Sequence, residues 1–270
     1  MNTYRFMATD LDGTLLNAEH RLSQKTAQTL TQLSKQGVTL TFATGRHFLD
    51  AQHLRRSIDG PVYLITANGA RIHDPEGNLL YAANLPPVLA KELMQKPWSE
   101  GLLTTYYDDN GWKTTEEYLD FELMHDQDSA FKYDIVDTAA HSGEGVIKAL
   151  YHGKHADLLQ LQAKLQAKFN QPTQQLYIVF SHPEFLEVMA AGVSKGNAIE
   201  FLLKQLSLSP KDCVAFGDGE NDIEMLTLVE KGYVMTPTST QLDRALPHLP
   251  RLGRAEEDSV ALELERLFQL

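Results

Sequence analysis

Cysteine is almost absent from this sequence, since Cys213 is the only one among 270 residues. A single cysteine cannot form an intrachain disulfide, so we expect the protein to work in a reducing compartment. No run of about 18 apolar residues occurs, which argues against a membrane-spanning helix. The first residues lack a basic segment followed by a long apolar run, so we expect no secretory signal. These absences together predict a soluble, cytoplasmic protein.

Basic residues are also scarce, because 24 lysines and arginines are present beside 36 aspartates and glutamates. The resulting net charge of −12 argues against general binding to nucleic acid or to an anionic membrane. A small phosphorylated metabolite is compatible with this charge, since a local cation or metal can override the overall field. The length allows one large domain or two of ordinary size. Nothing in the sequence indicates an oligomeric state.

Strand and helix patterns alternate over the first part of the chain. Short apolar runs rich in β-forming residues predict buried strands at residues 6–9, 38–43 and 61–66. A helical pattern follows Ser23, a favourable N-cap, and ends at Gly37, while a second extends to Leu54. This alternation predicts an α/β fold with a parallel sheet and right-handed crossovers.

The alternation stops after a predicted hairpin at residues 71–81. From about residue 85 to residue 187, helix and strand patterns are mixed without the earlier order. From residue 188 the α/β order returns. We therefore predict a discontinuous α/β core, residues 1–84 and 188–270, that carries an inserted α+β domain, residues 85–187.

Polar residues stand where several apolar runs end or where a helix begins. The side chains concerned are Asp10, Asp12, Thr44, Lys195, Asp218, Asn221 and Asp222. Taken singly, each is explained by a turn or a helix cap. At the carboxyl edge of one parallel sheet they would meet in a single crevice, and this edge is where open α/β sheets bind ligands.

Three or more carboxylates in one crevice repel one another unless a divalent cation lies among them. Because the set offers oxygen ligands and no cluster of histidine and cysteine, Mg²⁺ is favoured over zinc. A carboxylate beside Mg²⁺, with a threonine hydroxyl and a lysine ammonium nearby, is typical of phosphoryl transfer. One carboxylate would attack phosphorus, and another two residues away would act as general acid and base.

Four motifs carry a resemblance to a known family. They are Asp10-Leu-Asp12-Gly-Thr14, Thr44-Gly-Arg46, Lys195-Gly and Gly217-Asp218-Gly-Glu-Asn221-Asp222. In this order and spacing they resemble the four motifs of the haloacid dehalogenase (HAD) superfamily. The insertion between the second and third motifs resembles the type IIB cap of Cof-type phosphatases. Outside the insertion, residues 40–47, 63–69 and 246–250 also resemble Cof-type phosphatases. The resemblance implies a Rossmann-like, parallel-sheet HAD core with an inserted α+β cap domain.

The same resemblance implies a role for each motif residue. Asp10 resembles the nucleophile and a Mg²⁺ ligand, and Asp12 resembles the general acid and base, with its backbone carbonyl as a second metal ligand. Asp218 matches the metal-binding carboxylate of the last motif, and Asp222 a residue that orients Lys195 or metal-bound water. The phosphate-binding positions are matched by Leu11 (through its amide), Thr44, Lys195 and Asn221.

By resemblance, the protein is a Mg²⁺-dependent phosphatase that forms an aspartyl-phosphate on Asp10. The implied substrate is 4-amino-2-methyl-5-hydroxymethylpyrimidine pyrophosphate, and sugar phosphates, pyridoxal phosphate or FMN are broader alternatives. A phosphomutase of the same superfamily and a non-catalytic sensor of phosphorylated ligands are rival functions. The sensor is disfavoured because a binding protein needs no pair of nucleophile and acid. The cap would close over the crevice and select the leaving group.

Several residues outside the motifs have two interpretations. Tyr106, Tyr107 and Trp112 would either stack on a flat ring or pack inside the cap, and packing is favoured. His152 and His155 have a spacing compatible with a metal site, but the glycine between them favours a surface loop. Three residues near the expected crevice stay open between a ligand contact and a structural role: Arg46, His47 and Asn68.

Overall fold

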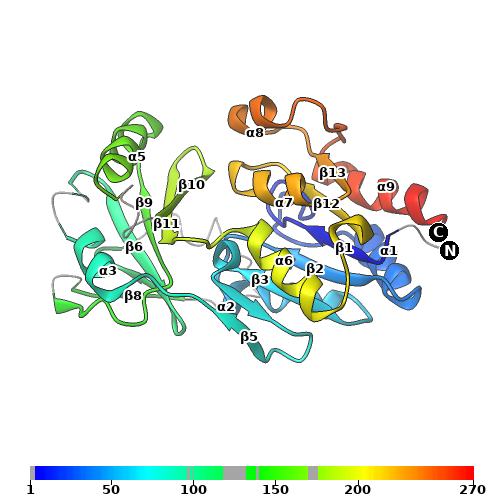
Figure 1. The fold of residues 1–270 in the computed structure, drawn as a ribbon, viewed down its shortest axis with the longest axis horizontal. Helices are drawn as coiled ribbons and strands as arrows, with labels where there is room; N and C mark the ends of the chain where they lie inside the picture. Colours follow the sequence, from blue (N-terminus) through cyan, green and yellow to red (C-terminus); the bar gives the residue numbers. More distant parts are fainter. Residues whose placement is uncertain (1–3, 96–97, 99, 118–131, 138–139, 170–175) are drawn as a thin grey trace.

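The structure of the protein is a computed structural model that describes residues 4–95, 98, 100–117, 132–137, 140–169 and 176–270. Two sheets organise these residues into two lobes (Figure 1). The first has seven strands in the order β13-β12-β1-β2-β3-β4-β5, and the second has six in the order β10-β11-β9-β6-β7-β8. We call the first lobe the core and the second the cap.

The core sheet is mainly parallel. Its parallel strands are β1 (Phe6–Thr9), β2 (Thr39–Ala43), β3 (Val62–Thr66), β12 (Cys213–Gly217) and β13 (Lys231–Val234). At one edge, β4 (Arg71–His73) and β5 (Leu79–Ala82) form an antiparallel hairpin. The predicted α/β class, the three early strands and the hairpin are therefore confirmed.

Helices cover both faces of the core sheet (Figure 1). They are α1 (Gln24–Lys35) and α9 (Ser259–Phe268) on one face, and α6 (Lys195–Gln205) and α7 (Ile223–Leu228) on the other. Side chains of a strand alternate between faces, so Met7 packs with the first helix pair while Phe6 and Ala8 pack with the second. This double cover explains why the core strands are apolar at nearly every position.

Two short helices of the core differ from the sequence prediction. The helical pattern that was expected to run as far as Leu54 is broken into α2 (Phe48–Ala51) and a 3₁₀ turn at Leu54–Ser57. Asp50 is fully buried and paired with Arg46, which holds the first turn, while Leu54 enters the apolar core from the second. In addition, α8 (Thr240–Ala245), capped by Ser239, was not predicted.

The cap sheet is mainly antiparallel. Its strands are β6 (Leu103–Asp108), β7 (Gly111–Thr114), β8 (Tyr133–Ile135), β9 (Lys148–His152), β10 (Leu176–His182) and β11 (Phe185–Ala190), of which only β7 and β8 pair in parallel. Helices α3 (Pro87–Leu93) and α5 (His155–Phe169) pack on one face. The cap strand β11 continues to Ala190, which is three residues past the predicted limit at residue 187. The domain limits at residues 85 and 187 remain a prediction.

The other face of the cap sheet is turned toward the core. On β9 and β11, Tyr151 and Leu186 pack under the helices, whereas Leu150 and Phe185 are turned the opposite way, toward a cavity. The period of two in a strand therefore divides the cap sheet into a helix-covered face and a core-facing face.

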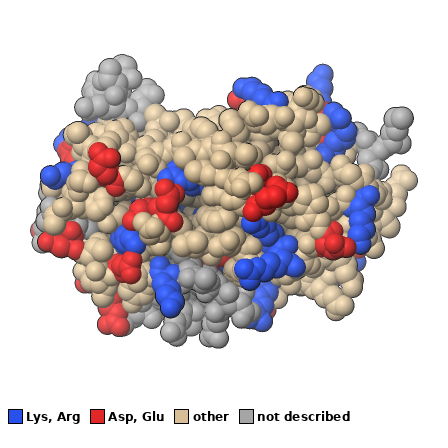
Figure 2. All heavy atoms as spheres, turned by 90° about the horizontal axis from the view of Figure 1, so that it is seen from below, with Lys and Arg blue, Asp and Glu red and all other residues tan. Residues whose placement is uncertain are grey.

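Charged side chains are interspersed on the face shown in Figure 2, where the described lysines and arginines lie among aspartates and glutamates. No continuous basic surface is visible among the described residues of that face. In the part of the chain that the structure describes, no helix is both long and apolar enough to cross a membrane.

Candidate active site

A cavity of about 580 Å³ lies between the core and the cap. Its core wall lies at the carboxyl ends of β1, β2 and β12 and is defined here by Asp10, Asp12, Thr44, Arg46, Asp218 and Asn221. Its cap wall is the core-facing side of the cap sheet and is defined by Tyr107, Trp112, Leu150, His152, Phe185 and Glu187. The predicted crevice at the sheet's carboxyl edge thus has a second wall from the cap.

Asp10 follows β1 directly, and its backbone amide donates a hydrogen bond to the Phe216 carbonyl at 3.0 Å. This bond continues the pairing of β1 with β12 and holds the side chain at the strand end. One carboxylate oxygen, Oδ1, accepts hydrogen bonds from the Leu11 amide at 2.7 Å and from Lys195 Nζ at 2.8 Å. The side chain is buried but still reaches the cavity.

Lys195 is completely buried at the start of α6, which Ser194 caps. Its Nζ donates to Asp10 and, at 2.7 Å, to Oδ1 of Asp222. Burial alone would lower the pKa of Lys195, but the two carboxylates outweigh burial and raise this pKa above its usual value. The ammonium therefore stays charged between Asp10 and Asp222.

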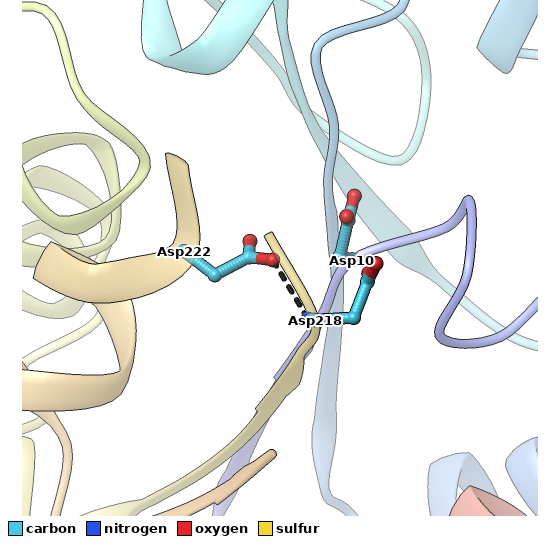
Figure 3. A group of neighbouring side chains, drawn as sticks. All are labelled: Asp10, Asp218 and Asp222. Atoms are coloured by element: carbon cyan, nitrogen blue, oxygen red, sulfur yellow. Dashed lines mark hydrogen bonds between the residues drawn. The ribbon is translucent and has the colours of Figure 1, made fainter. Parts of the chain in front are cut away.

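Asp222 is fully buried, and both of its oxygens are engaged. Oδ1 accepts from Lys195, and Oδ2 accepts the backbone amides of Asp218 and Gly219 at 3.0 Å each. Figure 3 shows the hydrogen bond from the Asp218 backbone amide to Asp222. It also shows the Asp218 side chain turned toward Asp10. Asp222 thus shapes the loop that carries Asp218, whose Oδ1 accepts the Thr14 hydroxyl at 2.9 Å.

Three carboxylates share this site. Asp10, Asp218 and Asp222 each offer an oxygen within 4.8 Å of the others (Figure 3). Burial, then the negative charge of Asp222, raises the pKa of Asp10 well above its usual value and that of Asp218 to about 7. One lysine among three carboxylates leaves negative charge uncompensated, and the donors are hard oxygens. These residues fit a divalent cation such as Mg²⁺.

Asp12 is held by Arg46 in a two-pronged ion pair. Arg46 Nε donates to Oδ2 at 2.7 Å and Nη2 to Oδ1 at 2.6 Å, while His20 lies 3.3 Å from Oδ1. Burial favours a higher pKa for Asp12, but Arg46 and His20 outweigh it and hold this pKa far below its usual range. Arg46 also pairs with buried Asp50 at 3.2 Å. Arg46 therefore forms the predicted structural ion pair and, in addition, lines the cavity.

The remaining predicted residues lie in or next to the core wall. Thr44 is buried at the end of β2, where its hydroxyl accepts the Arg46 amide at 3.1 Å. Asn221 lines the cavity, and its Nδ2 donates to Oδ1 of Asn68 at 3.0 Å. Leu11 contributes its amide to Asp10, while its side chain packs in the apolar core. The structure thus brings together all eight residues predicted for the site.

Sequence reasoning missed a polar bridge between core and cap, which we call the clasp and define as Lys148, Glu187 and Asn68. Lys148 Nζ lies 2.8 Å from Oε2 of Glu187 and donates to the Gly45 carbonyl at 2.8 Å. Asn68 Nδ2 donates to the same Oε2 at 2.5 Å. All three side chains are buried. Alternation along β9 and β11 was the available signal, since it groups Lys148 with Leu150 and His152 on one face of β9, and Glu187 with Phe185 on one face of β11.

Two predictions about the cap are refined. Tyr106 packs under the cap helices, as favoured, whereas Tyr107 and Trp112 pack on the opposite face and also line the cavity. His152 was expected in a surface loop but ends β9 and lines the cavity. His155 starts α5 with Nδ1 2.8 Å from the Pro183 carbonyl, and neither histidine joins a metal-ligand group among the described residues.

Comparisons with known proteins agree with this architecture. The family model of haloacid dehalogenase-like hydrolases matches residues 7–264. An HMP-PP phosphatase of Escherichia coli O157:H7 is 39% identical over 257 residues, which cover 95% of this chain and 93% of that protein. An HMP-PP phosphatase of Escherichia fergusonii is 38% identical with the same coverage.

Solved structures share the fold at lower identity. A haloacid dehalogenase-like hydrolase from B. subtilis superposes with a TM-score of 0.84 at 23% identity, covering 97% of this chain and 99% of that one. A sugar phosphatase of HAD subclass IIB superposes with a TM-score of 0.81 at 20% identity, covering 98% and 100%. At these identities the similarity establishes the two-lobed fold alone.

Proposed function

Because this chain belongs to the haloacid dehalogenase-like hydrolase family and is a phosphatase of small phosphorylated compounds, we propose that it hydrolyses HMP-PP through a phosphoenzyme on Asp10. HMP-PP is 4-amino-2-methyl-5-hydroxymethylpyrimidine pyrophosphate, and the names of the similar proteins give it as their substrate. We assign residues 1–84 and 188–270 to the catalytic core and residues 85–187 to the cap that meets the leaving group.

One observation carries the proposed mechanism. Asp10, Lys195 and Asp218 come from distant parts of the chain and meet at the carboxyl edge of the core sheet, with Lys195 donating to Asp10 at 2.8 Å. We propose that Asp10, Asp218 and the backbone carbonyl of Asp12 hold Mg²⁺, which would neutralise charge on the transferring phosphoryl oxygens. The Leu11 amide and the Thr44, Lys195 and Asn221 side chains would bind the remaining phosphate oxygens.

The reaction follows in two steps. A carboxylate oxygen of Asp10 attacks the terminal phosphorus, the bond from phosphorus to the leaving-group oxygen breaks, and Asp12 donates a proton to that oxygen. Asp12 then takes a proton from a water molecule whose oxygen attacks the phosphorus. The bond between Asp10 and phosphorus breaks, and inorganic phosphate leaves.

Asp12 would act as an acid in the first step and as a base in the second, and its ion pair with Arg46 affects both roles. Arg46 stabilises the ionised carboxylate, which suits the base that accepts a proton from water in the second step. The first step requires a protonated Asp12, which the ion pair disfavours. We therefore propose that Asp12 leaves Arg46 when a negatively charged substrate enters, since a phosphate would compete with Asp12 for the guanidinium.

The test is phosphate release from HMP-PP by the purified protein in the presence of Mg²⁺. We expect one inorganic phosphate per substrate consumed, no release after EDTA treatment, and recovery when Mg²⁺ is restored. A phosphomutase would instead form an isomeric product with little release of phosphate. Hydrolysis that persists in EDTA would contradict the metal assignment, and absence of hydrolysis would contradict the substrate.

A further inference from the structure

The cap wall of the cavity contains rings that no motif assigns to the reaction. Strands β9 and β11 pair antiparallel with Phe185 directly opposite His152. The two rings are stacked, with centroids 4.8 Å apart and planes 27° from each other. His182, at the end of β10, lies 5.7 Å from the Phe185 ring and also lines the cavity. We call these three residues the aromatic shelf.

Strand geometry aims the shelf at the cavity. His152 and Leu150 lie on the same face of β9, and Phe185 and Glu187 on the same face of β11, because side chains two positions apart point the same way. All four line the cavity, opposite the core wall that contains Asp10. A molecule whose phosphate contacts Asp10 therefore presents its remaining part to this face.

Glu187, the carboxylate beside the shelf on β11, already has partners within the protein. Glu187 accepts the Ser181 hydroxyl at 2.7 Å through Oε1, and its Oε2 is bound by Lys148 and Asn68 of the clasp. A polyhydroxylated leaving group needs several converging donors and acceptors, and these carboxylate oxygens are committed elsewhere. The other side chains that line the cavity around the shelf are the apolar Leu150 and the carboxylate Glu184, next to the ring of Phe185.

We propose that the aromatic shelf is the binding subsite for a flat heteroaromatic ring of the leaving group, with Phe185 as its central specificity-determining residue. Offset stacking of a third ring on such a pair is favourable and tolerates different ring substituents. The subsite rests on the proposed function, because it assumes that the phosphate is transferred to Asp10. It favours phosphate esters or anhydrides of heteroaromatic alcohols over sugar phosphates.

The test compares two substrates in wild type and Phe185→Leu. Pyridoxal 5′-phosphate supplies a flat heteroaromatic ring, and acetyl phosphate supplies a phosphate without one. Loss of one stacking partner predicts that the ratio of their kcat/KM values falls about 3- to 10-fold, mainly through KM for pyridoxal 5′-phosphate. Phe185→Tyr keeps the ring and is expected to retain the wild-type ratio.

Phe180→Leu is the matched control, because Phe180 lies on β10 but packs under the cap helices. This variant is expected to keep the wild-type ratio. An equal loss for both substrates in Phe185→Leu, or an unchanged ratio, would overturn the subsite.

Different experimental outcomes would contradict the subsite and the proposed function. If HMP-PP is hydrolysed at the same kcat/KM by wild type and Phe185→Leu, the subsite is wrong and the proposed function stands. If HMP-PP is not hydrolysed but the ratio for pyridoxal 5′-phosphate falls as expected, the proposed substrate is wrong and the subsite stands.

Discussion

The two walls of the cavity are built by sheets of different design. The core wall lies at the ends of parallel strands, and its side chains are charged and linked to one another, as in the contacts of Lys195 with Asp10 and Asp222. The cap wall is the face of an antiparallel sheet, where rings and an internally paired carboxylate line the cavity. Under the proposed function, this arrangement would separate the chemistry of the phosphate from recognition of the leaving group.

The largest effect is expected at the core wall, from Asp10→Asn. Removing the attacking carboxylate while keeping its shape should lower kcat by about 10⁴-fold or more. Phosphate release measures the rate, and circular dichroism checks that the variant is folded. Asp243→Asn is the matched control, because it removes the same charge from an exposed ion pair with Arg251. A rate for Asp10→Asn within ten-fold of wild type would refute the phosphoenzyme.

The clasp tests whether the two walls depend on each other. Lys148→Met leaves Glu187 buried without its ammonium partner, which should lower the free energy of unfolding by about 3–5 kcal/mol. Urea denaturation measures this loss.

Two further variants show whether that loss of stability comes from an unpaired buried charge. Lys148→Met combined with Glu187→Met should recover part of the loss, because no unpaired charge remains in the interface. Lys204→Met breaks an exposed pair with Glu200 on α6 and should change the free energy of unfolding by less than about 0.5 kcal/mol. Equal losses for Lys148→Met and Lys204→Met would show that the buried pair of the clasp contributes no more to stability than an exposed pair.

The smallest effect concerns His73, which lies in the core hairpin away from both walls. Burial, followed by Arg71 and Arg55, lowers its pKa to about 4. The unfolded chain then binds more protons than the folded one between about pH 6.5 and pH 4, so stability falls as the pH falls through this window. From pH 7.5 to pH 5 this one group should remove about 2 kcal/mol.

His73→Phe should abolish that part of the pH dependence and keep a ring stacked on Phe48, whose centroid lies 3.8 Å from that of His73. Urea denaturation of both proteins at the two pH values gives the comparison. An identical loss of stability in wild type and variant would contradict the assignment to His73.

The two walls also differ in how well the sequence predicts them. At the core wall, Asp10 and Asp218 come directly after buried strands, and parallel strands bring their carboxyl ends to one edge. Local pattern and topology together therefore placed these carboxylates in one site. The contact of Asp12 with Arg46 was beyond this reasoning, because a guanidinium on a long side chain reaches several partners.

The cap wall was mostly missed. Lys148, His152 and Phe185 belong to no motif, and each looks like an ordinary strand residue. Alternation would have placed Lys148 and His152 on one face of β9, but it does not say which face meets the core. The interpretation of His152 as a surface residue failed because the strand ends at the cavity rather than in solvent.

The amino-acid sequence alone was enough to predict the core strands, the α/β class and the polar residues that meet at the core wall, because each depends on apolar runs and on polar residues beside them. Tertiary structure alone decided the partners that cross between strands and lobes. The pairing of Phe185 with His152 depends on strand register, and the contact of Lys148 with the Gly45 carbonyl depends on how the cap sits on the core. Such contacts join residues distant in sequence, and no local pattern encodes the distance between them.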